Sequence, residues 1–167
     1  MRTLVALLCV AVSVVAASAG ASTESPLCKG SQLAGSFAGV PGSAGAGNIT
    51  YRLVLRNRSN AECQLSGLPS ARLLGKTGNA LPTHVRAAFP GALAAVLVRL
   101  APGSKTRATA RFSPDVPGVG ETTVGRCEPI AYWLRVNAQG GGTTRVKITP
   151  PTSVCEHGRL NFSAYGY

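Results

Sequence analysis

Few residues of this chain have the types and spacing that enzyme catalysis requires. A nucleophilic hydrolase needs a nucleophile, a base and an orienting acid, but the only histidines are His84 and His157 and the only aspartate is Asp115. No G-x-S-x-G turn occurs, because the nearest match, residues 42–45 (GSAG), follows Pro41 where the motif needs glycine. We expect His84 to be a surface or packing residue and His157 a loop residue near a disulfide, and we predict that the protein is not an enzyme.

The acids and cysteines do not form a recognisable catalytic or metal-binding set. A glycosidase needs two carboxylates that flank one bond, whereas the acids of this chain fall in predicted loops with no shared motif: Glu24, Glu62, Asp115, Glu121, Glu128 and Glu156. The cysteine spacings contain no C-x-x-C and no paired histidines, which argues against zinc. The only methionine is Met1, which excludes the usual blue-copper ligand set from the mature chain. We therefore expect no metal and no cofactor.

Arginine and lysine are the residues best suited to carry a function. They number 17 against 6 acids, which gives a formal net charge of +11. The binding residues that we predict are Arg52, Arg56, Lys105, Arg107, Arg111 and Arg135, with Arg145 and Lys147 adding to the outward set. If their strands are neighbours, one sheet presents a cationic face to anionic lipid, phosphorylated glycan or nucleic acid. The alternative is an ordinary solvated surface. Nucleic acid is the least expected partner, because no aromatic residues are interleaved with the arginines.

Alternation with a period of two predicts the strands that would position these residues. In residues 49–56 the apolar side chains at 49, 51, 53 and 55 take one face, and residues 105–112 alternate in the same way. Further short strands are expected at 32–40, 71–74, 81–86, 93–100, 130–136, 145–148 and 160–164. Turns rich in glycine and proline separate them, and Pro150 should end the strand at 145–148.

This pattern predicts an all-β protein, an antiparallel immunoglobulin-like β-sandwich of about eight or nine short strands. A small barrel is the alternative. Trp133, the only tryptophan, either packs on a disulfide or occupies a partly exposed edge position. Residues 113–125 contain two prolines, three glycines and two acids, so we expect a long loop there.

The first residues predict export. Arg2 provides a basic start, residues 4–17 are almost wholly apolar, and Ala17-Ser18-Ala19 matches a small-x-small cleavage site. We predict a signal peptide at 1–19, with Ala21 as the alternative cleavage position, a flexible leader at 20–27 and one domain at 28–167. An uncleaved anchor is the competing interpretation. No later apolar segment is long enough to span a membrane, so we expect a secreted, extracellular protein.

Four cysteines remain after the signal peptide, and an even number in an exported chain predicts disulfides. Four cysteines allow three pairings. We favour Cys28–Cys63 and Cys127–Cys155, because each is local in sequence and would join the ends of neighbouring strands.

Several motifs carry a resemblance to a known family. They are LVLRNRS at 53–59, CQLSGLP at 63–69, LL at 73–74 and LAPGSKTRA at 100–108. With Cys28 before them and Cys127 and Cys155 after them, they resemble the domain-of-unknown-function family 4232 (DUF4232) over roughly residues 28–162. The family usually has N-T-S at 57–59, where this chain has NRS. The resemblance implies an exported β-sandwich of actinobacterial, even mycobacterial, origin. It implies no established activity, so no functional residue follows from it.

Together these features predict a secreted, non-enzymatic binding domain that acts at or outside the cell envelope. The expected partner is an anionic envelope component held by the arginine and lysine face. The alternative is a protein-interaction or protease-inhibitor-like module that binds another secreted protein through the loop at 113–125.

Overall fold

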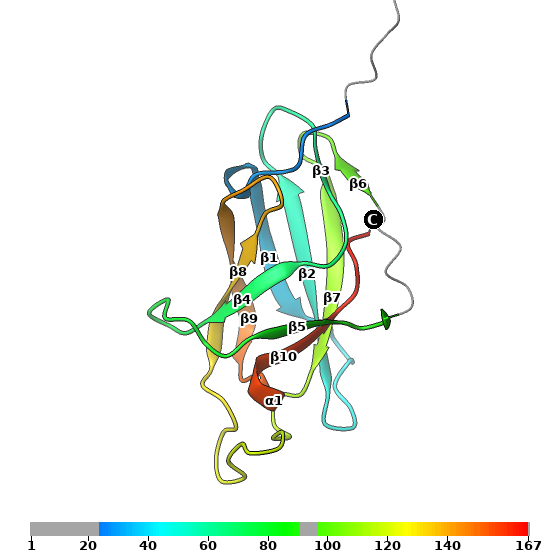
Figure 1. Cartoon of the computed structure of the whole chain (residues 1–167). Coiled ribbons are helices and arrows are strands. Elements are labelled where there is room, and N and C mark those ends of the chain that lie inside the picture. Colours follow the sequence, from blue (N-terminus) through cyan, green and yellow to red (C-terminus); the bar gives the residue numbers. More distant parts are fainter. Residues whose placement is uncertain (1–23, 91–96, 167) are drawn as a thin grey trace, which may run out of the picture.

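The computed structural model describes residues 24–90 and 97–166, and nearly all of its regular structure is β-strand (Figure 1). The predicted signal peptide at 1–19 and the first part of the predicted strand at 93–100 lie outside these residues. The described strands are β1 (Leu33–Gly39), β2 (Ile49–Asn57), β3 (Cys63–Leu65), β4 (Ser70–Leu74), β5 (His84–Ala87), β6 (Val98–Leu100), β7 (Lys105–Phe112), β8 (Ala131–Asn137), β9 (Thr143–Thr152) and β10 (Arg159–Phe162).

Two short helical segments accompany the strands. The 3-10 turn η1 (Gly30–Gln32) leads into β1, and α1 (Cys155–Gly158) leads into β10. Within residues 24–90 and 97–166, no helix is both long enough and apolar enough to cross a membrane.

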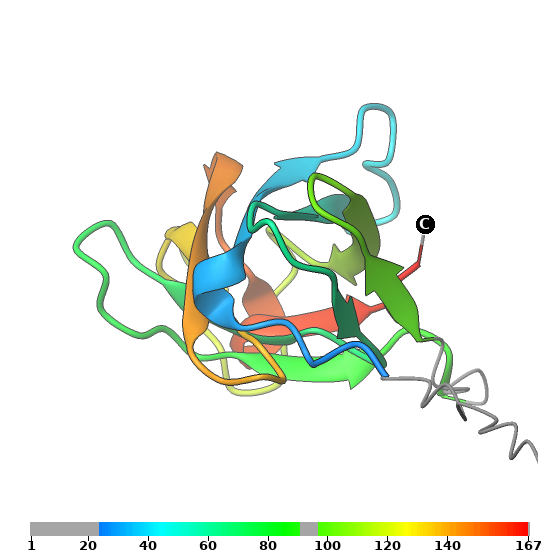
Figure 2. The same ribbon diagram turned by 90° about the horizontal axis from the view of Figure 1, so that it is seen from above.

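Eight strands form one curved sheet in the order β4-β8-β9-β1-β2-β7-β10-β5, and β3 pairs separately with β6. Most pairs are antiparallel, but β1 runs parallel to β9 and β10 runs parallel to β5. The edge strands β4 and β5 are consecutive in the chain. The sheet curves round until these two edges approach each other (Figure 2). Between them, the Leu81 N–H donates to Leu73 O at 3.0 Å. The sheet is therefore a nearly closed barrel.

The predicted all-β class with two disulfides is confirmed, while the arrangement of the strands differs in detail from an antiparallel sandwich. The main sheet is mixed, and it wraps almost into the barrel that was the alternative. The described residues contain ten strands rather than eight or nine. The sequence did not predict β3, because all three of its residues are buried and so show no alternation.

The alternation predicted for β2 and β7 is confirmed by burial. Tyr51, Leu53 and Leu55 of β2 are buried while the residues between them face outward. The β7 side chains at 106, 108, 110 and 112 are likewise buried. In the core, the Tyr51 ring lies 5.3 Å from the Phe37 ring and 5.1 Å from the Phe112 ring, at angles typical of packed aromatic pairs.

The alternation predicted for residues 130–136 is wrong in its first half. The register of β8 against β9 shifts between Ala131 and Trp133. Ala131 is therefore buried like Leu134, while Tyr132 and Trp133 are both half-buried, because an irregularity of this kind breaks the period of two. Trp133 is partly exposed, as one alternative predicted, but β8 lies between β4 and β9 and not at an edge of the sheet.

The prediction that Pro150 ends the ninth strand is also wrong. β9 continues through both prolines to Thr152, which pairs with Ala131. Proline lacks the N–H that a sheet interior requires. Here Pro150 and Pro151 lie opposite the register shift of β8 and beyond Thr149, the last residue of β9 that pairs with β1. The absence of an N–H group on these two prolines therefore disturbs the hydrogen bonding between the strands little.

Both predicted disulfides are present, one at each end of the barrel (Figure 1). Cys28–Cys63 ties the segment before β1 to β3, with Cα atoms 4.8 Å apart. Cys127–Cys155 ties the long connection between β7 and β8 to α1, with Cα atoms 5.5 Å apart.

Candidate functional site

Five of the predicted binding residues point outward from two neighbouring strands, and we call them the basic face: Arg52, Arg56, Lys105, Arg107 and Arg111. β2 pairs with β7 along its length, with Arg56 directly opposite Lys105 and Arg52 opposite the residue midway between Arg107 and Arg111. All five side chains are exposed. Arg56 Nε donates to Gly103 O at 3.2 Å. Within residues 24–90 and 97–166, none of the five forms a salt bridge.

Arg135, the sixth predicted residue, lies on a different side of the barrel. It belongs to β8, which β9 and β1 separate from β2. It lies opposite Arg72 of β4 and Arg145 of β9, and we call these three residues the arginine row. The Arg145 guanidinium lies 4.1 Å from the centre of the Trp133 ring. The Arg135 Nε is buried and has no hydrogen-bond partner in the described structure. The arginine row is therefore a second cationic surface, separate from the basic face.

The acids lie at the two ends of the barrel, and within the described residues none of them forms a salt bridge with the basic face or the arginine row. Glu24 and Glu62 lie at the Cys28–Cys63 end, where they accept hydrogen bonds from Gln64 and Ser25. The other four acids belong to the connection at 113–130 or to α1, at the opposite end (Figure 1). This separation leaves the positive charge of the basic face unneutralised by neighbouring carboxylates.

Two surface hollows lie along the basic face. One, of about 350 Å³, is lined by Arg52 and Arg107 together with the C-terminal segment. The other, of about 470 Å³, is lined by Arg111, Asn161 and Phe89. The Phe89 ring is 69% exposed, so an apolar surface lies beside a cation and an amide. Guanidinium groups hold planar anions such as carboxylate and phosphate through paired hydrogen bonds.

The connection at 113–130 contains the loop predicted at 113–125 and extends beyond it, and Glu121 anchors it to α1. The Glu121 side chain is only 2% exposed. Its Oε2 accepts from the N–H groups of Gly118 at 2.6 Å and Glu156 at 2.9 Å, and its Oε1 accepts from the N–H of His157. Glu156 and His157 both have φ of 57°, a left-handed conformation that is unfavourable for residues other than glycine. Glu121 stabilises that turn.

Glu128 and His157 complete a cluster around Glu121. The His157 Nδ1 lies 3.7 Å from Glu121 Oε1 and 3.8 Å from Glu128 Oε1. Burial alone would raise the pKa of Glu121, but the three backbone donors hold it below its usual value. Burial raises the pKa of Glu128, and the adjacent Glu121 carboxyl raises it further. We call these three residues the Glu–Glu–His cluster.

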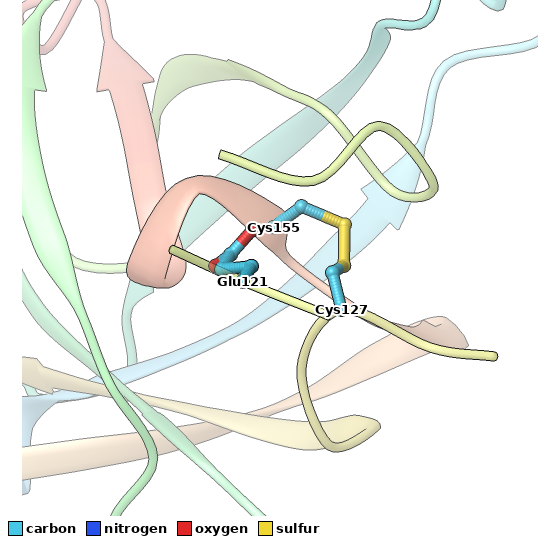
Figure 3. A group of neighbouring side chains, drawn as sticks. All are labelled: Glu121, Cys127 and Cys155. Atoms are coloured by element: carbon cyan, nitrogen blue, oxygen red, sulfur yellow. A yellow bond between two sulfur atoms is a disulfide. The ribbon is translucent and has the colours of Figure 1, made fainter. Parts of the chain in front are cut away.

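The disulfide Cys127–Cys155 lies beside this cluster. Figure 3 shows the Glu121 side chain next to the bonded sulfurs. Because metals bind the thiolate form of cysteine, the two sulfurs are not metal ligands in the oxidised protein.

Sequence reasoning missed the Glu–Glu–His cluster, although it placed His157 correctly near a disulfide. No motif joins positions 121, 128 and 157. The available signal was the predicted disulfide: Glu128 follows Cys127, and His157 lies two residues after Cys155, so pairing the cysteines brings both side chains together. His84, in contrast, lies exposed on β5. His157 has the carboxylate neighbours that an enzyme would need, so the absence of catalysis stays a prediction.

Comparison with known proteins identifies a family without assigning an activity. No curated protein and no solved structure matches this chain. The family model described as Domain of unknown function (DUF4232) matches residues 28–165, from the first disulfide cysteine through the last core tyrosine. This match covers most of the sequence, both disulfides and every described strand, and the chain belongs to the DUF4232 family.

Proposed function

We propose that this protein is an exported, non-enzymatic binding domain whose basic face holds anionic components of the cell envelope. The observation that carries the proposal is the pairing of β2 with β7, which brings five cationic side chains onto one surface, none of them in a salt bridge within the described residues. The two disulfides are consistent with an oxidising, extracellular location.

The chemistry of the basic face favours a polymer or surface that bears repeated phosphate or carboxylate groups. Arg52 and Arg107 border one hollow and Arg111 borders the next, so anionic groups in series could each meet a guanidinium. Phe89 and Asn161 offer an apolar surface and a hydrogen-bonding amide next to Arg111. This combination suits a ligand whose anionic groups alternate with rings or chains that are less polar.

Charge reversal tests the proposal. The variant Arg107→Glu/Arg111→Glu should bind isolated envelope fragments at least tenfold more weakly than the native protein at low salt. Each cation close to an anionic surface contributes about 1 kcal/mol, and reversal both removes two attractions and adds two repulsions. Co-sedimentation across a salt series measures this, and native binding should fall as salt rises.

A matched control separates the basic face from net charge. Arg72→Glu/Lys147→Glu makes the same change of charge on β4 and β9, where both side chains are exposed. It should weaken binding by less than about threefold at moderate salt, because exposed charges farther apart than about 8–10 Å are largely screened. Equal losses in both variants would show that the effect is one of overall charge, and the proposed site would be wrong.

A second candidate function rests on the loop at 113–125. Val119 is 99% exposed and Val124 is 86% exposed, and exposed apolar residues of this kind are typical of contact surfaces. Binding that ignores salt, survives charge reversal and disappears when residues 122–124 are replaced by glycine and serine would favour capture of a protein partner by this loop.

A further inference from the structure

We propose that Glu121, Glu128 and His157 form a binding site for a divalent transition-metal ion such as zinc. The site lies at the base of the loop at 113–130, where it joins α1. This inference does not depend on the basic face or on any ligand of that face.

The three donor atoms converge on one point. The His157 Nδ1 lies 3.7 Å from Glu121 Oε1 and 3.8 Å from Glu128 Oε1, and one ligand atom from each residue lies within 4.8 Å of the others. Two ligand atoms held tetrahedrally at about 2.0–2.1 Å from zinc are about 3.3–3.4 Å apart. Small side-chain rotations would therefore close the cluster around an ion.

The histidine has the tautomer that a metal ligand needs. His157 Nε2 lies 3.0 Å from Val119 O. A carbonyl oxygen can only accept, so Nε2 carries a hydrogen, and Nδ1 is the ring atom that faces Glu121 and Glu128 and is the one free to bind a metal ion in the neutral ring. Metal-ligating histidines typically donate their second N–H to a backbone carbonyl in this way, which fixes the orientation of the ring.

The carboxylates are held in place before any ion arrives. Three backbone N–H groups fix the orientation of Glu121. Glu128 is 14% exposed at its side chain, follows the bonded Cys127, and accepts at its own backbone oxygen from Ser153 Oγ at 2.9 Å. A site whose ligands are already ordered loses little conformational freedom on binding.

The charges around the cluster point to the same conclusion. The chain has 17 basic residues, yet within the described residues neither Glu121 nor Glu128 has an arginine or lysine within salt-bridge distance. Arg159 pairs with Glu156 instead, at 3.0 Å. The two adjacent carboxylates repel each other, and a divalent cation between them would remove the repulsion.

The donor set indicates the class of ion. Imidazole nitrogen with carboxylate oxygens suits zinc and related transition metals more than calcium or magnesium, which prefer oxygen alone. Three protein ligands leave at least one position for water, and the His157 side chain is 54% exposed and lines a surface hollow of about 390 Å³. The ion would thus tie the loop to α1 alongside the disulfide, with a coordination position open to an outside ligand.

Titration of the metal-stripped, oxidised protein with zinc tests the proposal. Calorimetry should show one ion per chain, and the thermal unfolding midpoint should rise with zinc concentration because the ion binds the folded state. His157→Asn keeps a residue that tolerates the left-handed backbone but removes the imidazole, and Glu128→Gln removes a carboxylate of the same shape. Each should weaken zinc binding more than about tenfold.

Two controls keep the result specific. Glu156→Gln removes the adjacent acid, which pairs with Arg159, and His84→Asn removes the other histidine; both should bind zinc like the native protein. In the absence of zinc, Glu128→Gln should unfold at the native midpoint or above it, since it relieves repulsion, so its loss of zinc binding could not be ascribed to misfolding. The proposal is wrong if the native protein does not bind zinc. It is also wrong if His157→Asn and Glu128→Gln bind zinc as tightly as the native protein does.

Discussion

Asn57 shows how a single amide holds three segments of this barrel together. Its side chain is fully buried at the end of β2. Nδ2 donates to Ala61 O at 2.7 Å and to Leu100 O at 2.9 Å, while Oδ1 accepts from the N–H and the hydroxyl of Ser59. The amide thus links β2, the following turn and β6. Asn and Ser residues such as those at 57–60 are typical of turns, but the contact with Leu100 depends on the fold.

Removing this amide should destabilise the protein strongly. Asn57→Ala removes the Asn57 donor from the buried Leu100 carbonyl and the Asn57 acceptor from the Ser59 N–H, so we expect the free energy of unfolding to fall by about 2–4 kcal/mol. Urea unfolding of the oxidised protein measures this. Asn60→Ala, in the same turn but exposed, should change the free energy by less than about 0.5 kcal/mol. Similar effects at the two positions would contradict the linking role of Asn57.

At the scale of elements, the two disulfides join chain segments of similar length but different burial. They close loops with sequence separations of 35 and 28 residues, so the chain-entropy model gives each about 3–4 kcal/mol of stabilisation. Cys28 and Cys63 are wholly buried, whereas Cys127 is only half-buried. Loss of the first pair therefore also leaves an unfilled space in the core.

The double variants should rank accordingly. Cys28→Ala/Cys63→Ala should lower the free energy of unfolding by more than Cys127→Ala/Cys155→Ala does, because it adds a cavity cost to the loss of the cross-link. Denaturant unfolding of the two variants, each with its remaining disulfide confirmed by mass spectrometry, measures the difference. The reverse order would mean that the loop at 113–130 contributes more to stability than the buried end of the barrel.

The local pattern predicted the elements better than their assembly. Alternation identified β2 and β7 and the outward direction of Arg52 and Arg107, because each strand has one buried face. It could not indicate that β9 lies parallel to β1, since partners distant in sequence leave no local periodicity. For the same reason, the sequence pattern did not show that Arg135 lies apart from the basic face. Nor did it show that Glu121 lies beside His157.

At the scale of the molecule, one hydrophobic core extends across both sheets. Buried side chains of the eight-stranded barrel and of the β3–β6 pair belong to a single cluster. Leu65 and Val98 from the small sheet join Leu53 and Phe112 from the large one. The two sheets therefore do not have separate cores, and the chain should fold as one unit.

Cooperative unfolding follows from this shared core. In the oxidised protein, far-ultraviolet circular dichroism, which reports on all the strands, and tryptophan emission, which reports on β8, should give coincident urea transitions. Separate midpoints would show that the β3–β6 end opens independently of the barrel.

The position of Trp133 has an optical consequence. The chain's single tryptophan lies beneath Arg145, beside the arginine row and several strands away from the basic face. We therefore expect its fluorescence to change little when a ligand occupies the hollows near Arg107 and Arg111. Because the Arg145 guanidinium lies over this indole and attracts anions, we expect iodide to quench it more effectively than a neutral quencher of equal size. Trp133 can thus serve as an intrinsic fluorescent probe of the arginine row, separate from the basic face.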